Sequence, residues 1–290
     1  MEQIRRIFKK ALNVCVPGNL PKFMIIGAQK AGTTSLHYYL SQHASLIGSR
    51  PKEVNFFSHD NNFEKGINWY RQAFVNIKSP LKKLTSFEAT PEYLYRKNVA
   101  ERLYQFNPDL KVVILLRDPV KRAFSAWNMY KYFGEREKGI PRQFYTNYCK
   151  DRDNNIYKEL YGGANFPTFE EAIDSELEKL HSESELEEPS FLRRGIYLPQ
   201  IEKYINLFGR DNVLILGFKD IVAKDKSEVL NEICNFVGLP LKDWSQVRDD
   251  KTNSRRYQEP ISEKMIEKLQ SFYQPHNEAL FEFLGKKINW

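Results

Sequence analysis

The segment from Gly27 to Ser35 contains the residue types that bind an anion. Its small residues allow backbone N–H groups to approach an oxyanion, and a helical pattern that begins at Thr33 directs the positive end of a helix to the same place. The hydroxyl groups of Thr33, Thr34 and Ser35 add hydrogen-bond donors, and Lys30 adds a mobile positive charge. The segment therefore predicts a loop that binds phosphate or sulfate; the alternative is an ordinary turn between a strand and a helix.

The position of the lysine distinguishes this loop from that of nucleotide-hydrolysing enzymes. Their pattern, GxxxxGK[ST], places a lysine directly after the second glycine and a hydroxyl for magnesium beside it. Here Gly27 and Gly32 keep the spacing of the glycines, but the lysine is Lys30, inside the loop, and Thr33 takes its usual place. The charge is thereby moved from the end of a triphosphate toward the bond between a phosphate and its leaving partner.

Buried strands that alternate with helices are predicted to position this loop. Apolar runs typical of buried strands lie at 23–27, 111–116 and 213–216. Helical patterns lie at 33–43, 169–180, 195–208 and 227–237. Strand, loop and helix recurring in this order predict an α/β fold with a central parallel sheet flanked by helices. We expect one domain over residues 21–290, a helical extension over 1–20, and an insertion beside the cleft over the polar residues 134–190.

The loop belongs to a series of segments that resemble one enzyme family. Ile25-Ile-Gly-Ala-Gln-Lys-Ala-Gly-Thr-Thr-Ser-Leu36 resembles the 5′-phosphosulfate loop of sulfotransferases that use 3′-phosphoadenosine-5′-phosphosulfate (PAPS). It is most similar to the heparan sulfate glucosaminyl N- and 3-O-sulfotransferase branch. Further segments resemble that branch in order, at Lys52–Phe57 (its KExxFF segment), Lys65–Tyr70, Phe87–Pro91, Leu115–Ser125 (its 3′-phosphate motif) and Leu280–Trp290.

The resemblance covers nearly the whole chain and implies a fold and a reaction. The fold is the P-loop-like sulfotransferase fold. The reaction is in-line transfer of a sulfuryl group from PAPS to a hydroxyl, or secondarily an amine, of a carbohydrate or small-molecule acceptor, with release of 3′-phosphoadenosine-5′-phosphate (PAP). Lys30 is then expected to stabilise charge on the bridging oxygen as the S–O bond breaks.

The resemblance also assigns the acceptor side. Glu53 matches the general base of the family, and Phe56 and Phe57 are expected to shield it from water so that it can accept a proton near neutral pH. A surface ion pair with Lys52 is the alternative for Glu53. Glu88 is the second candidate base, and we expect it rather to orient the acceptor or a cationic side chain. The acceptor side is expected to comprise Glu88, Lys52 and Trp69.

A second phosphate group is expected to be held by later residues of the chain. Arg117 and Ser125 match the family's 3′-phosphate site, in which a guanidinium ends a strand and a hydroxyl follows in the next helix. A local ion pair with Asp118 is the alternative for Arg117. The basic loop at Asn253–Tyr257 is similar to the family's phosphate clamp, although its glycine is missing; the alternative is a run of solvated charges. The residues expected to bind PAPS are Lys30, Ala31, Gly32, Thr33, Thr34, Ser35, Arg117, Ser125, Ser254, Arg255 and Arg256.

Two positions depart from the family pattern and leave the acceptor open. Ala89 occupies the place of a lysine that usually follows the glutamate, and Asn55 occupies the place of a histidine that is frequent in the 3-O branch. Both positions face the acceptor in the family. A polysaccharide, a glycolipid and a small hydroxylated metabolite therefore all remain possible acceptors.

Composition limits the partners and suggests a compartment. Lysine and arginine number 44 against 37 acidic residues, a net charge of +7 that fits an anionic ligand, whereas the lack of a dense basic arm argues against nucleic acid. Three cysteines without paired spacing indicate free thiols and predict a cytoplasmic location. No run of about 18 apolar residues predicts a membrane span, although residues 1–16 could touch a membrane surface. No metal-ligand spacing is found, so we expect no metal.

Two other functional classes compete with a sulfotransferase. A P-loop nucleotide kinase would need the lysine–hydroxyl pair and an acidic strand end for magnesium, whereas here Arg117 precedes the acid. A non-catalytic nucleotide-binding protein would not require Lys30 and Glu53 together. A turnover assay discriminates between an enzyme and such a binding protein.

Overall fold

The computed structural model describes residues 18–75, 84–136, 160, 165–180, 190–249 and 260–290. The chain divides into two compact units. The sheet unit comprises Met1–Leu116, Ile201–Ser254 and Ile288–Trp290, and the helical unit comprises Arg117–Gln200 and Arg255–Lys287. Each unit is described separately below.

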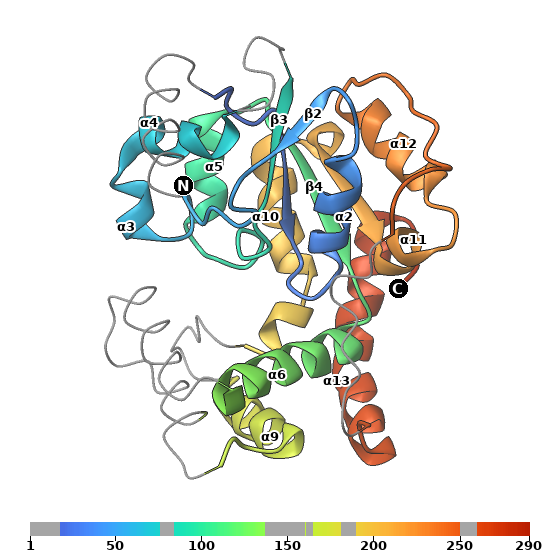
Figure 1. Ribbon diagram of the computed structural model, residues 1–290. Helices are drawn as coiled ribbons and strands as arrows, with labels where there is room; N and C mark the ends of the chain where they lie inside the picture. Colours follow the sequence, from blue (N-terminus) through green and yellow to red (C-terminus); the bar gives the residue numbers. More distant parts are fainter. Residues whose placement is uncertain (1–17, 76–83, 137–159, 161–164, 181–189, 250–259) are drawn as a thin grey trace. The chain divides into compact units, whose positions relative to one another are not determined.

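A five-stranded parallel sheet forms the centre of the sheet unit (Figure 1). Its strands are β1 (Phe23–Gly27), β2 (Leu46–Gly48), β3 (Thr85–Ala89), β4 (Lys111–Leu116) and β5 (Val213–Gly217). They are ordered β2-β3-β1-β4-β5, and every neighbouring pair is parallel. All residues of β1 are buried, as expected for a strand that is covered on both faces. This arrangement confirms the predicted α/β fold with a central parallel sheet.

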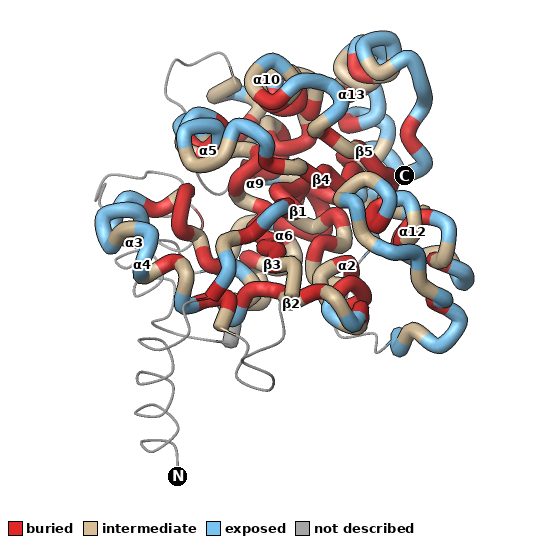
Figure 2. Tube along the Cα trace, turned by 90° about the horizontal axis from the view of Figure 1, so that it is seen from above, coloured by how far each residue is buried: buried red, intermediate tan, exposed pale blue. Residues whose placement is uncertain are grey.

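Helices cover both faces of this sheet. Its helices are α2 (Thr33–Leu40), α3 (Asp60–Phe63), α4 (Gly66–Arg71), α5 (Val99–Phe106), α11 (Phe218–Val222), α12 (Ser227–Phe236) and most of α10 (Leu198–Phe208). Seen from above, α5 and α10 lie on one face and α2 and α12 on the other, with buried residues concentrated along the strands between them (Figure 2). The 3-10 helices Gln72–Phe74 and Arg210–Asn212 complete the regular structure described in this unit.

The helical unit has its own aromatic core. Its elements are α6 (Pro119–Arg136), α9 (Phe169–Lys179), α13 (Glu263–Leu284) and the 3-10 helix Arg193–Gly195. Phe124 and Trp127 of α6 pack against Phe169 of α9, and Tyr273 of α13 joins the same core. Thr168 begins α9 with a capping box to Glu171, which satisfies two backbone donors at the helix start.

Most predicted elements match the structure closely. β1 and β4 have the predicted bounds, β5 extends one residue further, and α2 ends at Leu40 rather than near residue 43. Helix α13 has no counterpart in the sequence prediction, because Pro275 in its interior is unfavourable to a helix. Residues 1–17 and most of 134–190 lie outside the described residues, so the proposed extension and insertion stay predictions.

Candidate functional site

The glycine-rich loop follows β1 at the carboxyl end of the sheet. The chain leaves β1 toward β2 and β3, whereas β4 lies on the other side of β1, so the connections diverge between β1 and β4. Ligands of open α/β sheets bind where the strand order reverses in this way. The N–H of Ala28 donates to the carbonyl of Leu115 at 2.7 Å, which fixes the start of the loop against β4.

The conformation of the loop suits an anion. Lys30 has φ 68° and Gly32 has φ 91°, both in the left-handed region. The N–H of Ala31 donates to the carbonyl of Ala28 at 3.1 Å, so the loop closes on itself as a tight turn. Gly32 is the N-cap of α2 but supplies no capping side chain, and the first turn of α2 contains no acidic residue. Its backbone donors and positive helix end are therefore compatible with a phosphate or sulfate group.

There is also little room for a side chain at Gly32. A Cβ atom at Gly32 would lie 3.2 Å from the ring of Phe218 at the start of α11. Thr33 is buried, and Thr34 and Ser35 are half-buried in the first turn of α2. The structure thus places all six loop residues predicted to bind PAPS, from Lys30 to Ser35, in one turn and one helix start.

The predicted residues for a second phosphate lie in the helical unit. Arg117 directly follows β4 in the sequence and is the first residue of that unit. The hydroxyl of Tyr197 donates to the Arg117 carbonyl at 2.7 Å, and burial raises the pKa of Tyr197 to about 12, so this hydroxyl keeps its proton. Ser125 is buried on α6. Asp118 accepts from the N–H of Lys121 at 2.8 Å and so caps the start of α6.

Glu53 lies in a different environment from the predicted one. Its carboxylate forms an ion pair with Lys52 at 2.6 Å, and 46% of its side chain is exposed. Phe56 and Phe57 do not shield it, because both rings are buried against Tyr70. The predicted desolvation is therefore wrong, and the ion pair is the arrangement present. The carboxylate remains accessible from solvent.

Glu88 is completely buried, with 0% exposure, which corrects the expectation that it contacts an acceptor. Its carboxylate accepts hydrogen bonds from the hydroxyls of Tyr70, Thr90 (2.5 Å) and Tyr93 (2.9 Å), and from the backbone N–H of Val54. Burial raises the pKa of Glu88 above its usual value, and these four donors partly oppose the shift.

Trp69 and the basic loop complete the predicted residues. Trp69 is half-buried beside Phe56, and the Lys65 ammonium lies over its ring at 4.4 Å from the centroid. One face of this ring is therefore already covered. Ser254, Arg255 and Arg256 lie outside the described residues, and their role stays a prediction.

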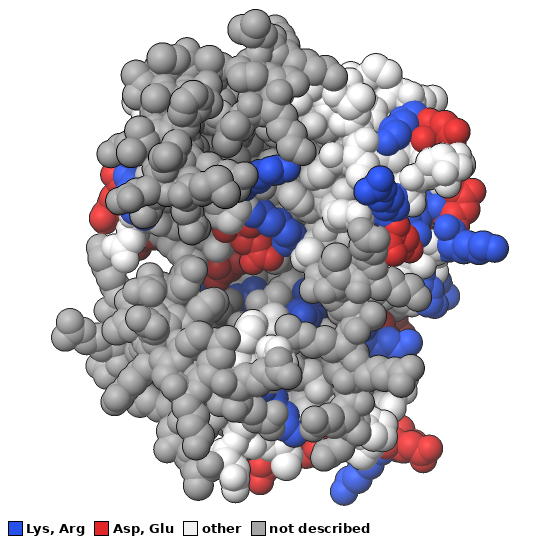
Figure 3. All heavy atoms as spheres, viewed as in Figure 1, with Lys and Arg blue, Asp and Glu red and all other residues white. Residues whose placement is uncertain are grey.

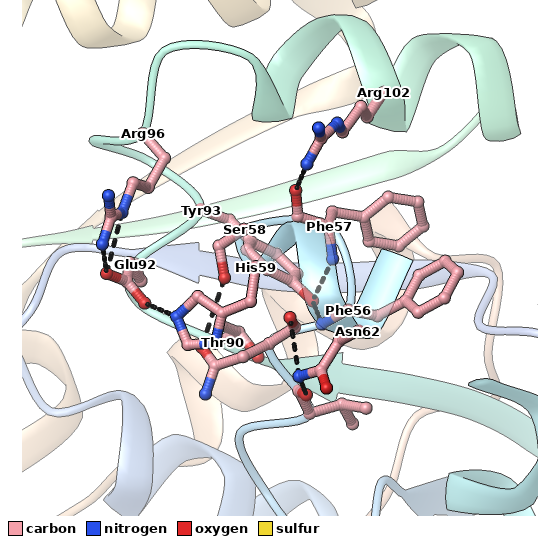
Figure 4. Close-up of polar contacts among 12 residues, drawn as sticks. Phe56, Phe57, Ser58, His59, Asn62, Thr90, Glu92, Tyr93, Arg96 and Arg102 are labelled. Carbon is pink, nitrogen blue, oxygen red and sulfur yellow. Dashed lines mark hydrogen bonds and ion pairs between the residues drawn. The ribbon is translucent and has the colours of Figure 1, made fainter. Parts of the chain in front are cut away.

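Several side chains that hold the segment Val54–Asp60 were not predicted from the sequence. Figure 4 shows that its backbone is held by side chains rather than by regular structure. The amide of Asn62 donates to the carbonyls of Val54 (3.3 Å) and Asn55 (3.2 Å), and Arg102 donates to the Phe57 carbonyl at 2.9 Å. The spacing of Glu88 and Thr90 could have indicated their contact, because residues two apart in an extended chain point to the same side. No sequence signal links Asn62 or Arg102 to this segment.

A histidine–carboxylate pair lies at the C-terminal end of the segment Val54–Asp60. The imidazole of His59 lies 3.1 Å from the Glu92 carboxylate, which also binds Arg96 at 2.9 Å (Figure 4).

On the described part of the face shown in Figure 3, basic and acidic side chains lie next to one another. Among the described residues there is no group of three or more potential metal ligands and no helix long and apolar enough to cross a membrane.

Comparison with known proteins identifies similar sequences and folds. The family profile described as "Sulfotransferase domain" matches residues 20–286. The chain is 25% identical to the membrane-associated sulfotransferase kil1 of Dictyostelium discoideum, over all of this chain and 71% of that protein. It is also 25% identical to mouse heparan sulfate glucosamine 3-O-sulfotransferase 5, over 93% of this chain and 74% of that protein.

Two further matches extend the comparison. Human bifunctional heparan sulfate N-deacetylase/N-sulfotransferase 3 is 27% identical over 92% of this chain, which spans only 30% of that protein. The crystal structure of a sulfotransferase from Alicyclobacillus acidocaldarius superposes with a TM-score of 0.66 at 26% identity, covering 93% of this chain and 98% of that one.

These relatives correct the predicted location. The cytoplasmic prediction is contradicted, since a relative over the whole chain is named as membrane-associated. The prediction relied on free thiols, yet Cys234 is buried, and burial raises its pKa. A buried thiol is protected from oxidation in any compartment, so it does not report the compartment.

Proposed function

Since the chain belongs to the sulfotransferase domain family and transfers a sulfuryl group from PAPS, we propose that its acceptor is a carbohydrate hydroxyl. A nucleotide kinase or a non-catalytic binding protein is not favoured by the family match. The observation that carries the assignment within the structure is the loop after β1, where the conformation at Lys30 and Gly32 and the start of α2 are compatible with a bound anion.

On the donor side, we assign the 5′-phosphosulfate to residues Lys30 to Ser35. PAPS supplies the activated sulfuryl group, whose S–O bond to the 5′-phosphate breaks. The Lys30 ammonium and the first N–H groups of α2 would stabilise the negative charge left on that phosphate. Arg117 and Ser125, with Ser254, Arg255 and Arg256, are assigned to the 3′-phosphate, which distinguishes PAP from AMP.

On the acceptor side, the difference in burial between the two carboxylates supports Glu53 as the base. A general base must reach the proton of the attacking hydroxyl to within hydrogen-bond distance. Glu53 retains 46% exposure and can meet an acceptor, whereas Glu88 is enclosed by its own donors. We therefore assign the base to Glu53: the acceptor oxygen bonds to sulfur while its proton passes to the Glu53 carboxylate. Lys52, the ion-pair partner of Glu53 at 2.6 Å, would help to hold that carboxylate in place.

The choice of a carbohydrate is supported by the names of the relatives and by the open position of Glu53. Two relatives of different type carry heparan sulfate in their names, one as a 3-O- and one as an N-sulfotransferase. A hydroxyl acceptor suits a carboxylate base, because the hydroxyl keeps its proton at neutral pH until the transfer. A glycolipid or a small hydroxylated metabolite would present the same group to the enzyme.

Ligand-dependent melting and a product assay test this function. PAP at saturating concentration should raise the melting temperature clearly more than AMP at equal concentration, because only PAP carries the 3′-phosphate. Incubation with PAPS and an array of oligosaccharides, glycolipids and small phenols should give a sulfated oligosaccharide by mass spectrometry. Equal shifts for PAP and AMP would contradict the 3′-phosphate site, and sulfation confined to the phenols would contradict the carbohydrate acceptor.

A further inference from the structure

The segment Lys52–Phe57, which carries Glu53, has no helix or strand. Its backbone is nevertheless held by hydrogen bonds from side chains of the core. We propose that the buried pair Glu88–Tyr93 positions this segment, and with it the Glu53 carboxylate, for proton transfer. Neither residue would touch the acceptor. This inference rests on the proposed role of Glu53 as the base.

The Tyr93 hydroxyl connects Glu88 to this segment, because it both donates and accepts hydrogen bonds. A phenolic hydroxyl has one proton to donate and lone pairs that accept. The Tyr93 hydroxyl donates to the Glu88 carboxylate at 2.9 Å. Its oxygen accepts from the N–H groups of Phe56 (2.9 Å) and Phe57 (3.3 Å) (Figure 4). Because Glu88 takes the proton, the lone pairs of Tyr93 face the two amides. The carboxylate thus sets the orientation of the hydroxyl.

Glu88 also holds the segment directly. It accepts from the backbone N–H of Val54, the residue that follows Glu53. Its remaining donors, the hydroxyls of Tyr70 and Thr90, do not bind this segment and satisfy the rest of the carboxylate. Four donors around one buried carboxylate are the arrangement that such a group requires in a low-dielectric interior.

The anchor is part of the sheet that also carries the anion loop. Glu88 lies in β3 and pairs with Met24 of β1, and β1 leads directly into the loop of Lys30. Base and anion loop are therefore both attached to neighbouring central strands of the sheet unit. Since reacting groups must be held within a fraction of an ångström, a rigid connection of this kind favours the reaction.

The first part of this segment is held by hydrogen bonds that do not involve Tyr93. The Ser49 hydroxyl donates to the Lys52 carbonyl at 2.7 Å, and Asn62 holds the carbonyls of Val54 and Asn55. Loss of Tyr93 alone should therefore loosen the segment at Phe56 and Phe57 without unfolding it. This makes the positioning role separable from folding.

Tyr93→Phe tests the proposal, and Tyr70→Phe is its matched control. Both tyrosines are fully buried and both donate to Glu88, but only Tyr93 binds the Phe56 and Phe57 amides. We expect Tyr93→Phe to lower kcat at least ~10-fold with PAP affinity changed less than about twofold, a separation typical of lost transition-state positioning. Tyr70→Phe should keep kcat within about threefold of the wild type.

A double variant separates positioning from general destabilisation. If Tyr93 acts through Glu53, Tyr93→Phe should cost little further activity once Glu53→Gln has removed the base. An additive loss in the double variant, or an equal loss in Tyr93→Phe and Tyr70→Phe, would overturn the proposal. Wild-type activity in Glu53→Gln alone would instead refute the assigned base, which distinguishes failure of the proposed function from failure of the positioning role.

Hydrogen exchange tests the proposal on the wild-type protein, so the result does not depend on whether a variant folds. The Phe56 and Phe57 amides should exchange as slowly as those of β3, although they lie in an irregular segment. Exchange as fast as that of exposed loop amides would overturn the proposal.

Discussion

Substitution of Gly32 by alanine tests the anion loop most directly. Gly32 has φ 91°, a left-handed conformation that costs an alanine about 1–2 kcal/mol. The new Cβ would also lie 3.2 Å from the Phe218 ring, so that the ring or the loop must move by a few tenths of an ångström. Overpacking of this kind costs about 1–2 kcal/mol more. The total is about 2–4 kcal/mol.

Gly238→Ala is the matched control. Gly238 also has a left-handed φ, of 70°, but no atom lies within 4 Å of the Cβ that alanine would add. It should lose only the conformational part, about 1–2 kcal/mol. At about 2–4 °C for each kcal/mol in a protein of this size, Gly32→Ala should melt roughly 4–16 °C below the wild type and Gly238→Ala roughly 2–8 °C below it, about half as much.

Ligand binding separates the two variants further. A shift of the loop moves the N–H groups at the start of α2, so PAP affinity measured by calorimetry should fall at least ~10-fold in Gly32→Ala, by about 1.4 kcal/mol. Gly238→Ala should bind PAP as the wild type does. Equal melting temperatures and equal PAP affinities for the two variants would refute the reasoning, since then neither the Phe218 contact nor the loop geometry would matter.

Two other predictions concern the charge in the loop and the half-buried His37. Lys30→Ala should lose about 100-fold or more in turnover, since one such group stabilises the transition state by about 3 kcal/mol; turnover of PAPS equal to the wild type would remove Lys30 from the mechanism. Burial, with repulsion from Lys52, lowers the pKa of His37 from 6.5 to about 4. The unfolded chain therefore binds the proton first, and the stability that His37 contributes above pH 6.5 is lost as the pH falls toward 4. In melting curves between pH 4.5 and 7.5, His37→Gln should lose less stability on acidification than the wild type; parallel profiles would contradict this.

The central strands were predictable because buried parallel strands are continuous apolar runs. The sequence of β1 and β4 indicates their bounds to the residue. β2, with three residues, is too short for such a signal. Pro275 concealed α13, because a proline inside a helix costs about 3 kcal/mol and this cost must be offset by tertiary packing.

The candidate site was predictable only where its residues are neighbours in sequence. Lys30 to Ser35 form one loop and one helix start, and their spacing alone indicates an anion site. The burial of Glu88 could not be predicted, because two of its donors, the Tyr70 hydroxyl and the Val54 backbone N–H, come from earlier segments of the chain. For the same reason the exposure of Glu53 was misjudged: the phenylalanines beside it in sequence pack away from it, onto Tyr70.

The backbone at Asn55 restricts which side chains can arise there during evolution. Its φ of 54° is tolerated by asparagine, aspartate, histidine and glycine, but disfavours β-branched and bulky residues. The neighbouring backbone groups are held by Tyr93 and Asn62, independently of the side chain at position 55. Exchange between asparagine and histidine, the residue frequent there in the 3-O branch that this chain resembles, thus requires no change of fold. A position expected to face the acceptor can in this way drift among a few polar residues, and acceptor preference can diverge by single substitutions.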